Sequence, residues 1–302
     1  MSGSVDRAAW LDGELVAPES IQLPLLAHAV QRGSLVFDVL DVVDTGSCRG
    51  GLAAREHVER FLRSARLMDM PIDHGVEELL AAAGRVVAEV VSPRFVRLCA
   101  WWAGETVMVT PASDDVPRVA VLCTSGPPLG VDETSVSVQI AEAVKLPAEV
   151  LPPAVKVAAA YTHGALATRR ARAAGFDEIV FRDVDGHLAE SAVMSLVVVE
   201  DGGIRTAPDT TVLDGITRRI VLELATAEGI PVEVAPLDGG LLDRADEAWF
   251  SSTSHPLWPI REVDGRPLPA APGPIGARLA VRLRALVAGD DPLSDRWIQP
   301  LG

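Results

Sequence analysis

The sequence predicts an α+β protein built from two domains. Apolar residues follow helical spacing in some segments and strand-like alternation in others, and tight-turn dipeptides separate the strand-like runs. Residues 125–130, SGPPLG, break this pattern with two prolines and two glycines, which is typical of a connection between domains. We therefore expect a small N-terminal domain over residues 1–124, an interdomain loop over 125–135 and a larger C-terminal domain over 136–302.

In the first half, the expected elements follow from turn chemistry and hydrophobic spacing. Asp12-Gly13 lies between apolar flanks and predicts a hairpin across residues 8–17. Val58, Phe61 and Ala65 recur at helical spacing and predict a helix over Arg55–Met70. The other expected elements are strands over Ser34–Val43, Phe95–Trp102, Thr106–Thr110 and Arg118–Cys123, and a helix over Val76–Val91 that Pro93 closes.

The second half alternates helical patterns with hairpin turns. We expect helices over Gly164–Ala174 and Gly215–Glu228. Hairpins are expected to turn at Asp185-Gly186, Asp201-Gly202 and Asp264-Gly265. Helices mixed with antiparallel hairpins indicate an α+β domain, which could be barrel-like.

Composition narrows the class of partner. A net charge of −15, with no dense run of basic residues, argues against binding to nucleic acid. The N-terminus is polar, and no uncharged apolar run reaches the length of a membrane span, so we expect a cytoplasmic protein without a membrane partner. Cys48, Cys99 and Cys123 are widely spaced, which favours buried thiols over a metal site or a disulfide framework.

Lysine is rare in this chain, and that directs attention to Lys156. Of 27 basic residues only Lys145 and Lys156 are lysine, and the chain has one tyrosine, Tyr161. A lysine that captures a carbonyl group needs desolvation or nearby positive charge, and Lys156 follows Pro153 within a run of small apolar residues. The alternative is a stem packed on a sheet with its amine in solvent. Lys145 has the more polar surroundings, so we expect it at the surface.

Glu190 is the carboxylate that stands out. It lies between the turn DVDGHL and the apolar run SAVMSLVVV, so it is outside any charged cluster. An electron-drawing pyridinium ring needs an anionic partner of this kind. A carboxylate at a strand edge, in water, is the competing interpretation.

Two short strings could bind phosphate or carboxylate groups. In LDGITRR, Gly215 frees the backbone where Ile216 and Thr217 open a helix, and the unpaired amides of a helix N-terminus suit a phosphate. The alternative is a plain capping turn with Asp214 as the cap. The second string, SSTSH at residues 251–255, is rich in hydroxyls, although such turns are common.

Two arginines lie on otherwise apolar elements. Strand alternation puts Phe95, Arg97, Cys99 and Trp101 on one face. An arginine among such neighbours usually has an anionic partner, which for Arg97 is either a ligand carboxylate or a structural ion pair. Arg60 lies on the helix of REHVERF and, taken alone, would be a solvated residue.

Taken in order, these strings resemble the class IV aminotransferases, the fold-type IV family of branched-chain aminotransferases, D-amino-acid transaminases and aminodeoxychorismate lyases. The resemblance runs from WLDGELV to GPIGARL. It implies a small N-terminal α/β sandwich, a larger C-terminal domain with a pseudo-barrel of mixed strands and helices, pyridoxal 5'-phosphate as cofactor, and a homodimer.

The resemblance also assigns roles to individual residues. It makes Lys156 the catalytic Schiff-base lysine, Tyr161 the partner of the cofactor's phenolic oxygen, and Glu190 the carboxylate on the pyridine nitrogen. The phosphate cup would comprise Arg60, Ile216, Thr217 and Thr253. The expected substrate residues are Arg32, Phe37, Phe95, Arg97, Ser254 and His255.

The chain departs from the family pattern around the substrate more than around the cofactor. Phe95 and Arg32 stand where tyrosines are common, and Val39 and Asp41 replace the usual small and basic residues of the substrate cavity. Family residues beside the cofactor also differ, since Ala160 replaces an asparagine and Met194-Ser195 replaces Glu-Asn.

The expected activity is a ping-pong transamination between an amino acid, with an apolar side chain, and a 2-keto acid. One alternative is β-elimination of the aminodeoxychorismate lyase kind, which yields p-aminobenzoate and pyruvate. Another is a non-catalytic homologue that only binds a small molecule. The sequence leaves substrate identity and enantiomer preference open.

Overall fold

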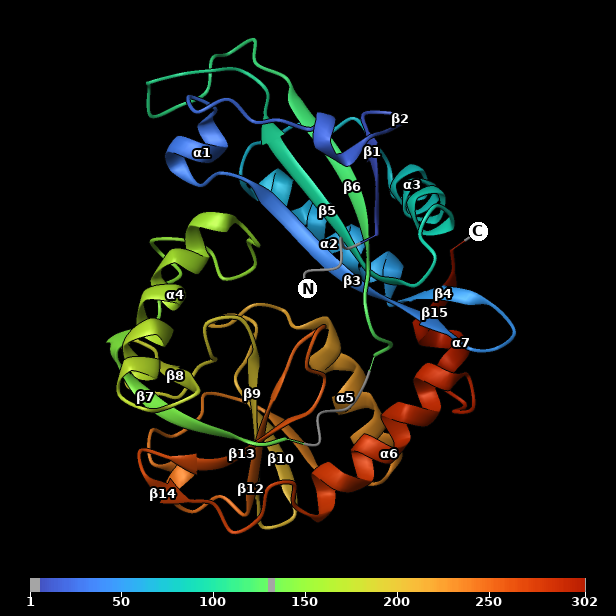
Figure 1. Ribbon diagram of the computed structural model, residues 1–302. Helices are drawn as coiled ribbons and strands as arrows, with labels where there is room; N and C mark the ends of the chain where they lie inside the picture. The colour runs from blue at the N-terminus through green and yellow to red at the C-terminus, as the bar shows by residue number, and fades with distance from the viewer. Residues whose placement is uncertain (1–5, 130–133, 302) are drawn as a thin grey trace. The chain divides into compact units, whose positions relative to one another are not determined.

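The computed structural model describes residues 6–129 and 134–301 (Figure 1). Its contacts divide the chain into two compact units. The first comprises Met1–Leu129, Val155–Ala159 and Leu286–Gly302, and the second comprises Gly130–Ala154 and Ala160–Ala285. Within the expected interdomain loop, residues 130–133 lie outside the described residues, and the domain boundaries drawn from the sequence stay a prediction.

The first unit is built on a seven-stranded sheet with the strand order β15-β4-β3-β5-β6-β1-β2. Its strands are β1 (Arg7–Leu11), β2 (Glu14–Val16), β3 (Val36–Asp44), β4 (Arg49–Leu52), β5 (Pro93–Trp102), β6 (Pro117–Ser125) and β15 (Ile298–Pro300). Its helices are α1 (His28–Arg32), α2 (Ala54–Leu67), α3 (Val76–Ala88), α7 (Ser294–Trp297) and the 3-10 turn η1 (Pro18–Ser20).

Helices α2 and α3 cover one face of this sheet (Figure 1). Val58 and Phe61 of α2 and Leu79 of α3 are fully buried, because helical spacing puts their apolar side chains on one stripe. Along β3 the side chains alternate: Asp38 bonds to α2, so the even positions face the helices and Phe37 faces the other side. The sheet therefore has one face for the core and one for Phe37 and its neighbours.

The second unit is built on an eight-stranded mixed sheet in which β11-β10-β9-β12-β13-β7-β8 is the main order and β14 pairs with β13. Its strands are β7 (Val136–Val144), β8 (Glu178–Arg182), β9 (Ser195–Glu200), β10 (Gly203–Thr206), β11 (Val232–Val234), β12 (Glu247–Ser251), β13 (Trp258–Val263) and β14 (Arg266–Pro267). Its helices are α4 (Ala158–Ala173), which begins in the first unit, α5 (Ile216–Ala227), α6 (Pro274–Ala288), which ends in the first unit, and the 3-10 turn η2 (Leu241–Asp243).

The core of the second unit lies on the apolar strands β9 and β12. Leu196, Val198 and Phe250 are buried in one cluster with Val138 and Ile260. The β9–β10 connection is a two-residue turn in which both residues have positive φ, which suits the Asp-Gly sequence found there. Because β9 and β12 pair in antiparallel fashion, the start of β9 and the end of β12 lie next to each other.

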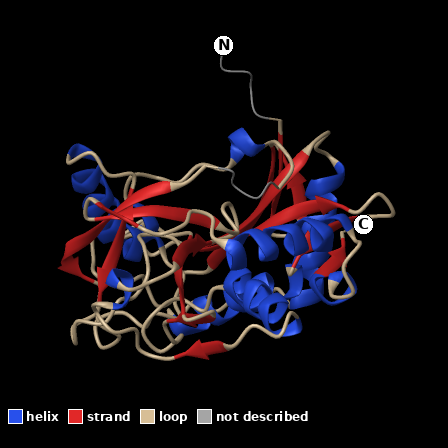
Figure 2. Ribbon diagram, turned by 90° about the horizontal axis from the view of Figure 1, so that it is seen from below, coloured by secondary structure: helices blue, strands red, loops and turns tan. Residues whose placement is uncertain are grey.

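Most expected elements are confirmed, and both helices and strands occur throughout the described chain (Figure 2). The strand expected over Thr106–Thr110 is wrong, because that segment consists of bends without a strand of its own. Helix α4 begins at Ala158, six positions before the expected Gly164. The apolar strands β7 and β8 are parallel, so the second sheet is not purely a set of hairpins.

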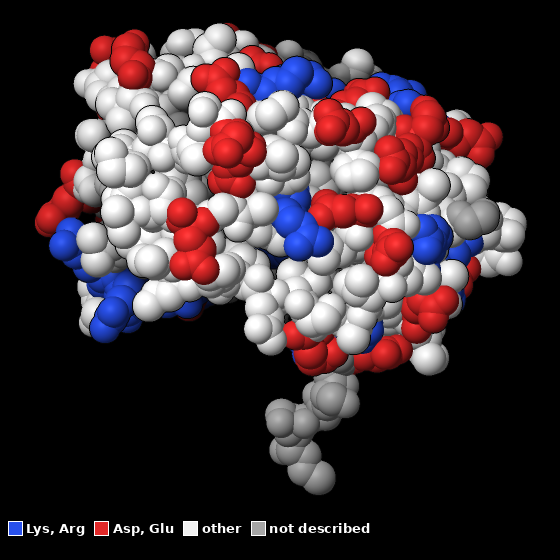
Figure 3. Space-filling model, turned by 90° about the horizontal axis from the view of Figure 1, so that it is seen from above, with Lys and Arg blue, Asp and Glu red and all other residues white. Residues whose placement is uncertain are grey.

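The surface agrees with the net charge of the chain. On the face drawn in Figure 3, acidic side chains are scattered among fewer basic ones. Across residues 6–129 and 134–301, no helix is both long and apolar enough to cross a membrane.

Candidate functional site

Lys156 is fixed to the first unit through its backbone. Its carbonyl accepts the Phe37 N–H at 3.1 Å, and its own N–H donates to the Ser64 hydroxyl at 3.1 Å. Residue 157 forms a bridge with Val36 next to it. These bonds attach residues 155–159 to β3 and α2 of the same unit, so the position of the lysine is set by that sheet.

The Lys156 ammonium lies 4.9 Å from the centroid of the Phe37 ring. The guanidinium of Arg97 lies 5.1 Å from the centroid of the same ring, and Arg97 is exposed. Two cations thus share one aromatic side chain, an arrangement that the ring quadrupole favours. The structure brings three of the predicted residues together on one face of one sheet.

Arg60 belongs to a buried cluster beneath this face. Its Nε and Nη2 donate to the two oxygens of Asp38 at 2.7 and 2.8 Å, and His57 Nδ1 lies 2.7 Å from Asp38 Oδ1. Arg60 is 4% exposed, so it is not the solvated helix residue that the sequence alone would indicate. The fork of the guanidinium matches the carboxylate geometry.

The charges in this cluster follow from burial and pairing. Burial on its own raises the pKa of the Asp38 carboxyl, but Arg60 and His57 outweigh burial and hold it well below its usual range. Burial lowers the pKa of His57 despite the nearby carboxylate. We therefore treat Arg60 as the counter-ion and His57 as a neutral ring near pH 7. Since an ionised carboxylate only accepts, Nδ1 carries the proton of that ring.

Asp41, which stands where the family pattern usually has a basic residue, forms a second buried ion pair. Asp41 is fully buried and lies 2.5 Å from Nη1 of Arg94, which also stacks over the Phe95 ring at 4.5 Å. Burial raises the pKa of Asp41 to about 8, although Arg94 opposes this shift. Asp41 is paired with Phe95 in the β3–β5 register, so this pair fixes the surroundings of Phe95.

Arg32 ends α1 and is exposed. Its guanidinium donates to the carbonyls of Gln31 and Val107, each at 3.0 Å. These bonds tie Arg32 to the segment after β5 and leave its expected role in substrate binding as a prediction.

In the second unit, Glu190 is 8% exposed and ion-paired. Its Oε1 lies 2.5 Å from Nζ of Lys145 and accepts the Leu213 N–H at 3.4 Å. Lys145 is half-buried, which corrects the expectation of a surface lysine. Each lysine of the chain therefore contacts a residue of the predicted site: Lys145 contacts Glu190, and Lys156 contacts Phe37.

Helix α5 begins at Ile216, as the sequence predicts. Its N-cap is Gly215 and no side chain caps it, so the alternative with Asp214 as the cap is wrong; Asp214 instead lies 3.4 Å from Arg219. A Cβ at Gly215 would lie 2.6 Å from the Ser195 hydroxyl, so only glycine fits there. The first amides of α5, at Ile216 and Thr217, have no partners within the helix.

The SSTSH string follows β12 and lies beside the start of β9. Ser251 pairs with Ser195, and the Ser251 hydroxyl is buried without a hydrogen bond to any described residue. Ser252 accepts the His255 N–H at 3.2 Å, and His255 stacks on Trp258 with centroids 4.5 Å apart. Because Ser195 touches both this turn and Gly215, the structure brings Thr253 and the start of α5 into one region of the second unit.

Tyr161 lies in the first turn of α4, which packs on β8. Gly164, three residues later, allows that helix to approach Ala192, since a Cβ there would lie 2.8 Å from the alanine side chain.

The predicted residues divide between the two units. The first unit holds Arg32, Phe37, Arg60, Phe95, Arg97 and Lys156, and the second holds Tyr161, Glu190, Ile216, Thr217, Thr253, Ser254 and His255.

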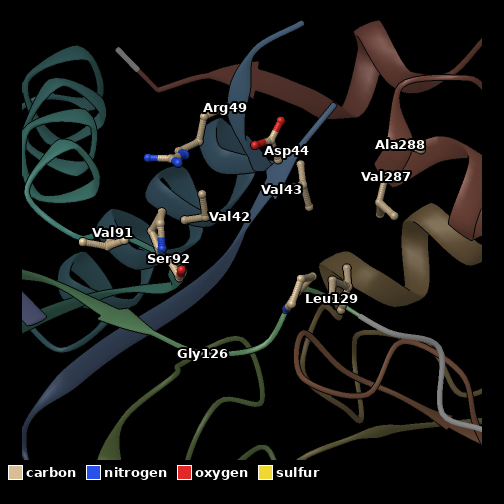
Figure 4. Close-up of a pocket in the computed structure, with 12 residues that line it drawn as sticks. Val42, Val43, Asp44, Arg49, Val91, Ser92, Gly126, Leu129, Val287 and Ala288 are labelled. Carbon is tan, nitrogen blue, oxygen red and sulfur yellow. The ribbon is translucent and has the colours of Figure 1, made fainter. Parts of the chain in front are cut away.

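Two cavities lie apart from the predicted residues. One, of about 450 Å³, lies in the first unit between the β3–β4 hairpin, with Asp44 and Arg49, and Val287 and Ala288 of α6 (Figure 4). The other, of about 330 Å³, lies in the second unit against Trp249 and α6. None of the predicted cofactor or substrate residues lines either cavity.

Sequence reasoning missed three residues that contact the predicted ones. Asp38 pairs with Arg60, His57 bonds to Asp38 beside it, and Lys145 pairs with Glu190. Asp38 is the one charged residue among the first five residues of β3, and His57 lies one turn before Arg60; both positions are usable signals. For Lys145 the signal is its rarity, which it shares with Lys156.

Comparisons with known proteins point to one family. Residues 35–263 match the model of the amino-transferase class IV family. The branched-chain-amino-acid aminotransferase of Pseudomonas aeruginosa is 27% identical over 296 residues, covering 97% of this chain and 96% of the relative.

Solved structures agree with this match. The branched-chain amino acid aminotransferase of Escherichia coli has a TM-score of 0.92 at 25% identity, covering 98% of this chain and 99% of that chain. The T.th. branched-chain amino acid aminotransferase, solved with pyridoxamine 5'-phosphate, has a TM-score of 0.92 at 30% identity and covers 98% of each chain. The expected fold class is confirmed. Because the family model spans most of the chain and the folds superpose over nearly its whole length, this protein belongs to the class IV aminotransferases.

Proposed function

We propose that this chain is a pyridoxal 5'-phosphate-dependent aminotransferase that passes an amino group between an amino acid with an apolar side chain and a 2-keto acid. The observation that carries the proposal is the fixed position of Lys156, whose amine lies against Phe37 while hydrogen bonds attach its backbone to β3 and α2. The branched-chain substrates named for the relatives support the apolar class.

The donor set fits the cofactor. An aldehyde needs an amine, which Lys156 supplies, and a protonated ring nitrogen needs a carboxylate, which Glu190 supplies. A phosphate needs amides and a fixed cation, available at the start of α5 and at Arg60. The buried Ser251 hydroxyl, which bonds to no described residue, is an unused donor in the same region as Thr253.

When bound, pyridoxal phosphate supplies an aldehyde that links to an amine and a ring that draws electrons from the substrate's α-carbon. Lys156 would hold the cofactor covalently and then, once displaced by the donor, move a proton with its Nζ. Glu190 would accept the ring N–H, and Tyr161 would donate to the phenolic oxygen. Arg60, Thr217, Thr253 and the Ile216 amide would orient the phosphate, which keeps the reacting atoms in register.

Arg97 is the best-supported substrate residue. It is exposed, contacts Phe37, and has no ion pair with any of the described residues. Of the two anionic partners that the sequence left open, a structural ion pair is therefore not formed with those residues. A substrate carboxylate would supply the missing anion. Phe37 and Phe95 would contact the apolar side chain, while Ser254, His255 and Arg32 stay candidates from the family resemblance.

Covalent trapping tests the cofactor chemistry. The protein is incubated with pyridoxal phosphate, reduced with borohydride and mapped by peptide mass spectrometry. The adduct is expected on Lys156, absent from Lys156→Ala and retained in Lys145→Ala. An adduct on Lys145, or none on the wild-type protein, would refute the assignment.

The substrate class needs a separate assay. Both enantiomers of branched-chain and acidic amino acids are offered with pyruvate or 2-oxoglutarate, and amino transfer is followed by chromatography. We expect the branched-chain donors to react fastest. Release of p-aminobenzoate and pyruvate from aminodeoxychorismate, without a keto acid, would instead identify the lyase alternative.

We also propose a homodimer, on the strength of the family resemblance, and a cytoplasmic location, because the three widely spaced cysteines fit a reducing compartment. Light scattering of the purified protein gives the mass of the assembly. A mass equal to a single 31.9 kDa chain at micromolar concentration would contradict the dimer.

A further inference from the structure

The second lysine of the chain contacts the carboxylate proposed for the ring nitrogen. Lys145 Nζ lies 2.5 Å from Glu190 Oε1, and the two side chains are 21% and 10% exposed. We infer that Lys145 is a positioning residue that fixes Glu190 by one oxygen and leaves the other directed to the cofactor's ring nitrogen. This inference rests on the proposed function.

Strand β8 lies between the two residues and bonds to the backbone of each. Lys145 donates its N–H to the carbonyl of Arg182 at 2.8 Å. The backbone carbonyl of Glu190 accepts the N–H of Phe181, the residue before Arg182, at 2.9 Å. Because residues 181 and 182 are consecutive on one strand, the spacing between the two side chains is set by the sheet rather than by a flexible loop.

The two oxygens of Glu190 have different partners. Oε1 takes both the Lys145 ammonium and the Leu213 N–H. No described residue donates a hydrogen bond to Oε2, and the shortest distance of the ion pair with Lys145 is to Oε1. A carboxylate held at one oxygen by a charge-assisted contact presents its second oxygen in a defined direction. That second oxygen is the acceptor available to a ring N–H.

The Leu213 contact cannot fix the carboxylate alone. At 3.4 Å it is longer than an ordinary N–H···O bond, so most of the restraint comes from the 2.5 Å ion pair. Another cation, Arg218, is buried and close enough to interact with Glu190, but its Nη1 donates to the carbonyl of Ala207. Lys145 is therefore the cation that contacts the carboxylate directly.

Loss of the ammonium should weaken ring binding without affecting the covalent step. Pyridoxamine 5'-phosphate is the probe, because it carries an amine in place of the aldehyde and cannot link to Lys156. Lys145→Met is expected to raise its dissociation constant about tenfold, the scale at which a supporting residue affects the ligand it orients. Lys145→Arg, which restores the cation, should return the constant to within about threefold of wild type.

The control is Arg266→Met, which removes a cation from an exposed ion pair with Asp243 on the β13–β14 hairpin of the same unit. A second ligand isolates the ring nitrogen: an analogue of the probe with carbon in that place should bind Lys145→Met and wild type equally. Lys145→Gln, which keeps much of the length of the side chain without its charge, provides a second variant should Lys145→Met fold poorly by circular dichroism.

The outcomes separate this inference from the function beneath it. Wild-type protein that binds pyridoxamine phosphate, with Lys145→Met and Lys145→Gln indistinguishable from Arg266→Met, overturns the role of Lys145 and leaves the proposed function intact. Equal losses for the probe and the carbon analogue overturn it as well, because the effect would not pass through the ring nitrogen. Wild-type protein that binds neither pyridoxal nor pyridoxamine phosphate overturns both proposals.

Discussion

Arg60 holds Asp38 by both carboxylate oxygens, with side-chain exposures of 5% and 0%. The residue proposed for the cofactor's phosphate is therefore itself positioned by an anion that lies on the opposite face of β3 from Phe37. A buried fork of this kind fixes the guanidinium and makes its orientation insensitive to solvent.

Asp38→Asn should destabilise the protein strongly. The change leaves Arg60 buried without a counter-ion, which costs about 3–5 kcal/mol in the free energy of unfolding. Urea denaturation measures it. The control is Glu77→Gln, which removes an exposed ion pair with Arg55 and should cost no more than about 1 kcal/mol. Equal costs for the two variants would contradict the importance of the buried pair.

The same cluster predicts an acid-side loss of stability. Because the folded protein holds the pKa of Asp38 below its usual range, its contribution is present above about pH 4 and is lost as the pH falls below that value. Unfolding free energies of wild type and Asp38→Asn should therefore converge between about pH 4 and pH 2. Curves that stay parallel through this range would count against a paired, ionised Asp38.

The Asp41–Arg94 pair predicts the opposite dependence. Burial raises the pKa of Asp41 to about 8, so the folded state binds more protons than the unfolded state between about pH 4 and pH 8, and stability from this group declines as the pH rises through that window. Asp41→Leu combined with Arg94→Met should remove this decline and add about 1–4 kcal/mol at pH 8.

The single change Arg94→Met is the comparison for that double variant. It leaves the Asp41 carboxyl buried without its cation, so it should cost stability where the double variant gains it. Thermal unfolding at pH 5 and pH 8 measures both. A double variant less stable than wild type at pH 8 would show that the ion pair is not a cost to the fold.

Arg97→Met should affect substrate binding rather than stability. Loss of one charge-assisted contact to a carboxylate lowers kcat/KM by about 10- to 100-fold, with most of the effect in KM. Arg118→Met, on β6 with an exposed partner in Asp12, is the matched control and should be near wild type. The absorbance of the bound cofactor should be the same in both variants. Unchanged KM values for every donor would remove Arg97 from the substrate site.

The cysteines should differ in reactivity. Burial raises the pKa of Cys99 to about 11 and that of Cys123 to about 12, so neither forms much of the reactive thiolate near neutral pH. Cys48 is half-buried in the β3–β4 hairpin. Iodoacetamide at pH 7.5 should label Cys48 first, as read by peptide mass spectrometry. Faster labelling of Cys123 would indicate opening of the first unit's sheet.

The sequence predicts best the elements whose signal is local. The hairpin at Asp12-Gly13 and the start of α5 at Ile216 are found because turn residues and a glycine at the helix N-cap are signals that lie within a few residues of the element. The strand predicted at Thr106–Thr110 is absent, since an apolar, β-branched run forms a strand only if a neighbouring strand can pair with it.

The sequence does not predict the residues that pair with Glu190 and Arg60, because those contacts too depend on segments far apart in the chain. The neighbours of Lys145 along the chain are Glu142 and Glu149, yet its partner Glu190 is 45 positions away and is brought to it by β8. Likewise the helix carrying Arg60 gives no sign of Asp38, which lies on a strand 22 positions earlier. Partners that only a sheet or a helix contact brings together leave no periodic trace in a single sequence.

The ion pair at Lys145 has a practical consequence for handling this protein. Both lysines are half-buried, and each is proposed to serve the cofactor, so amine-reactive dyes, cross-linkers and solid supports find no lysine that is remote from the proposed site. Labelling through an introduced lysine on the exposed β13–β14 hairpin would avoid this conflict. By the same reasoning, a loss of activity after lysine acylation can be traced to one of two side chains in a single peptide map.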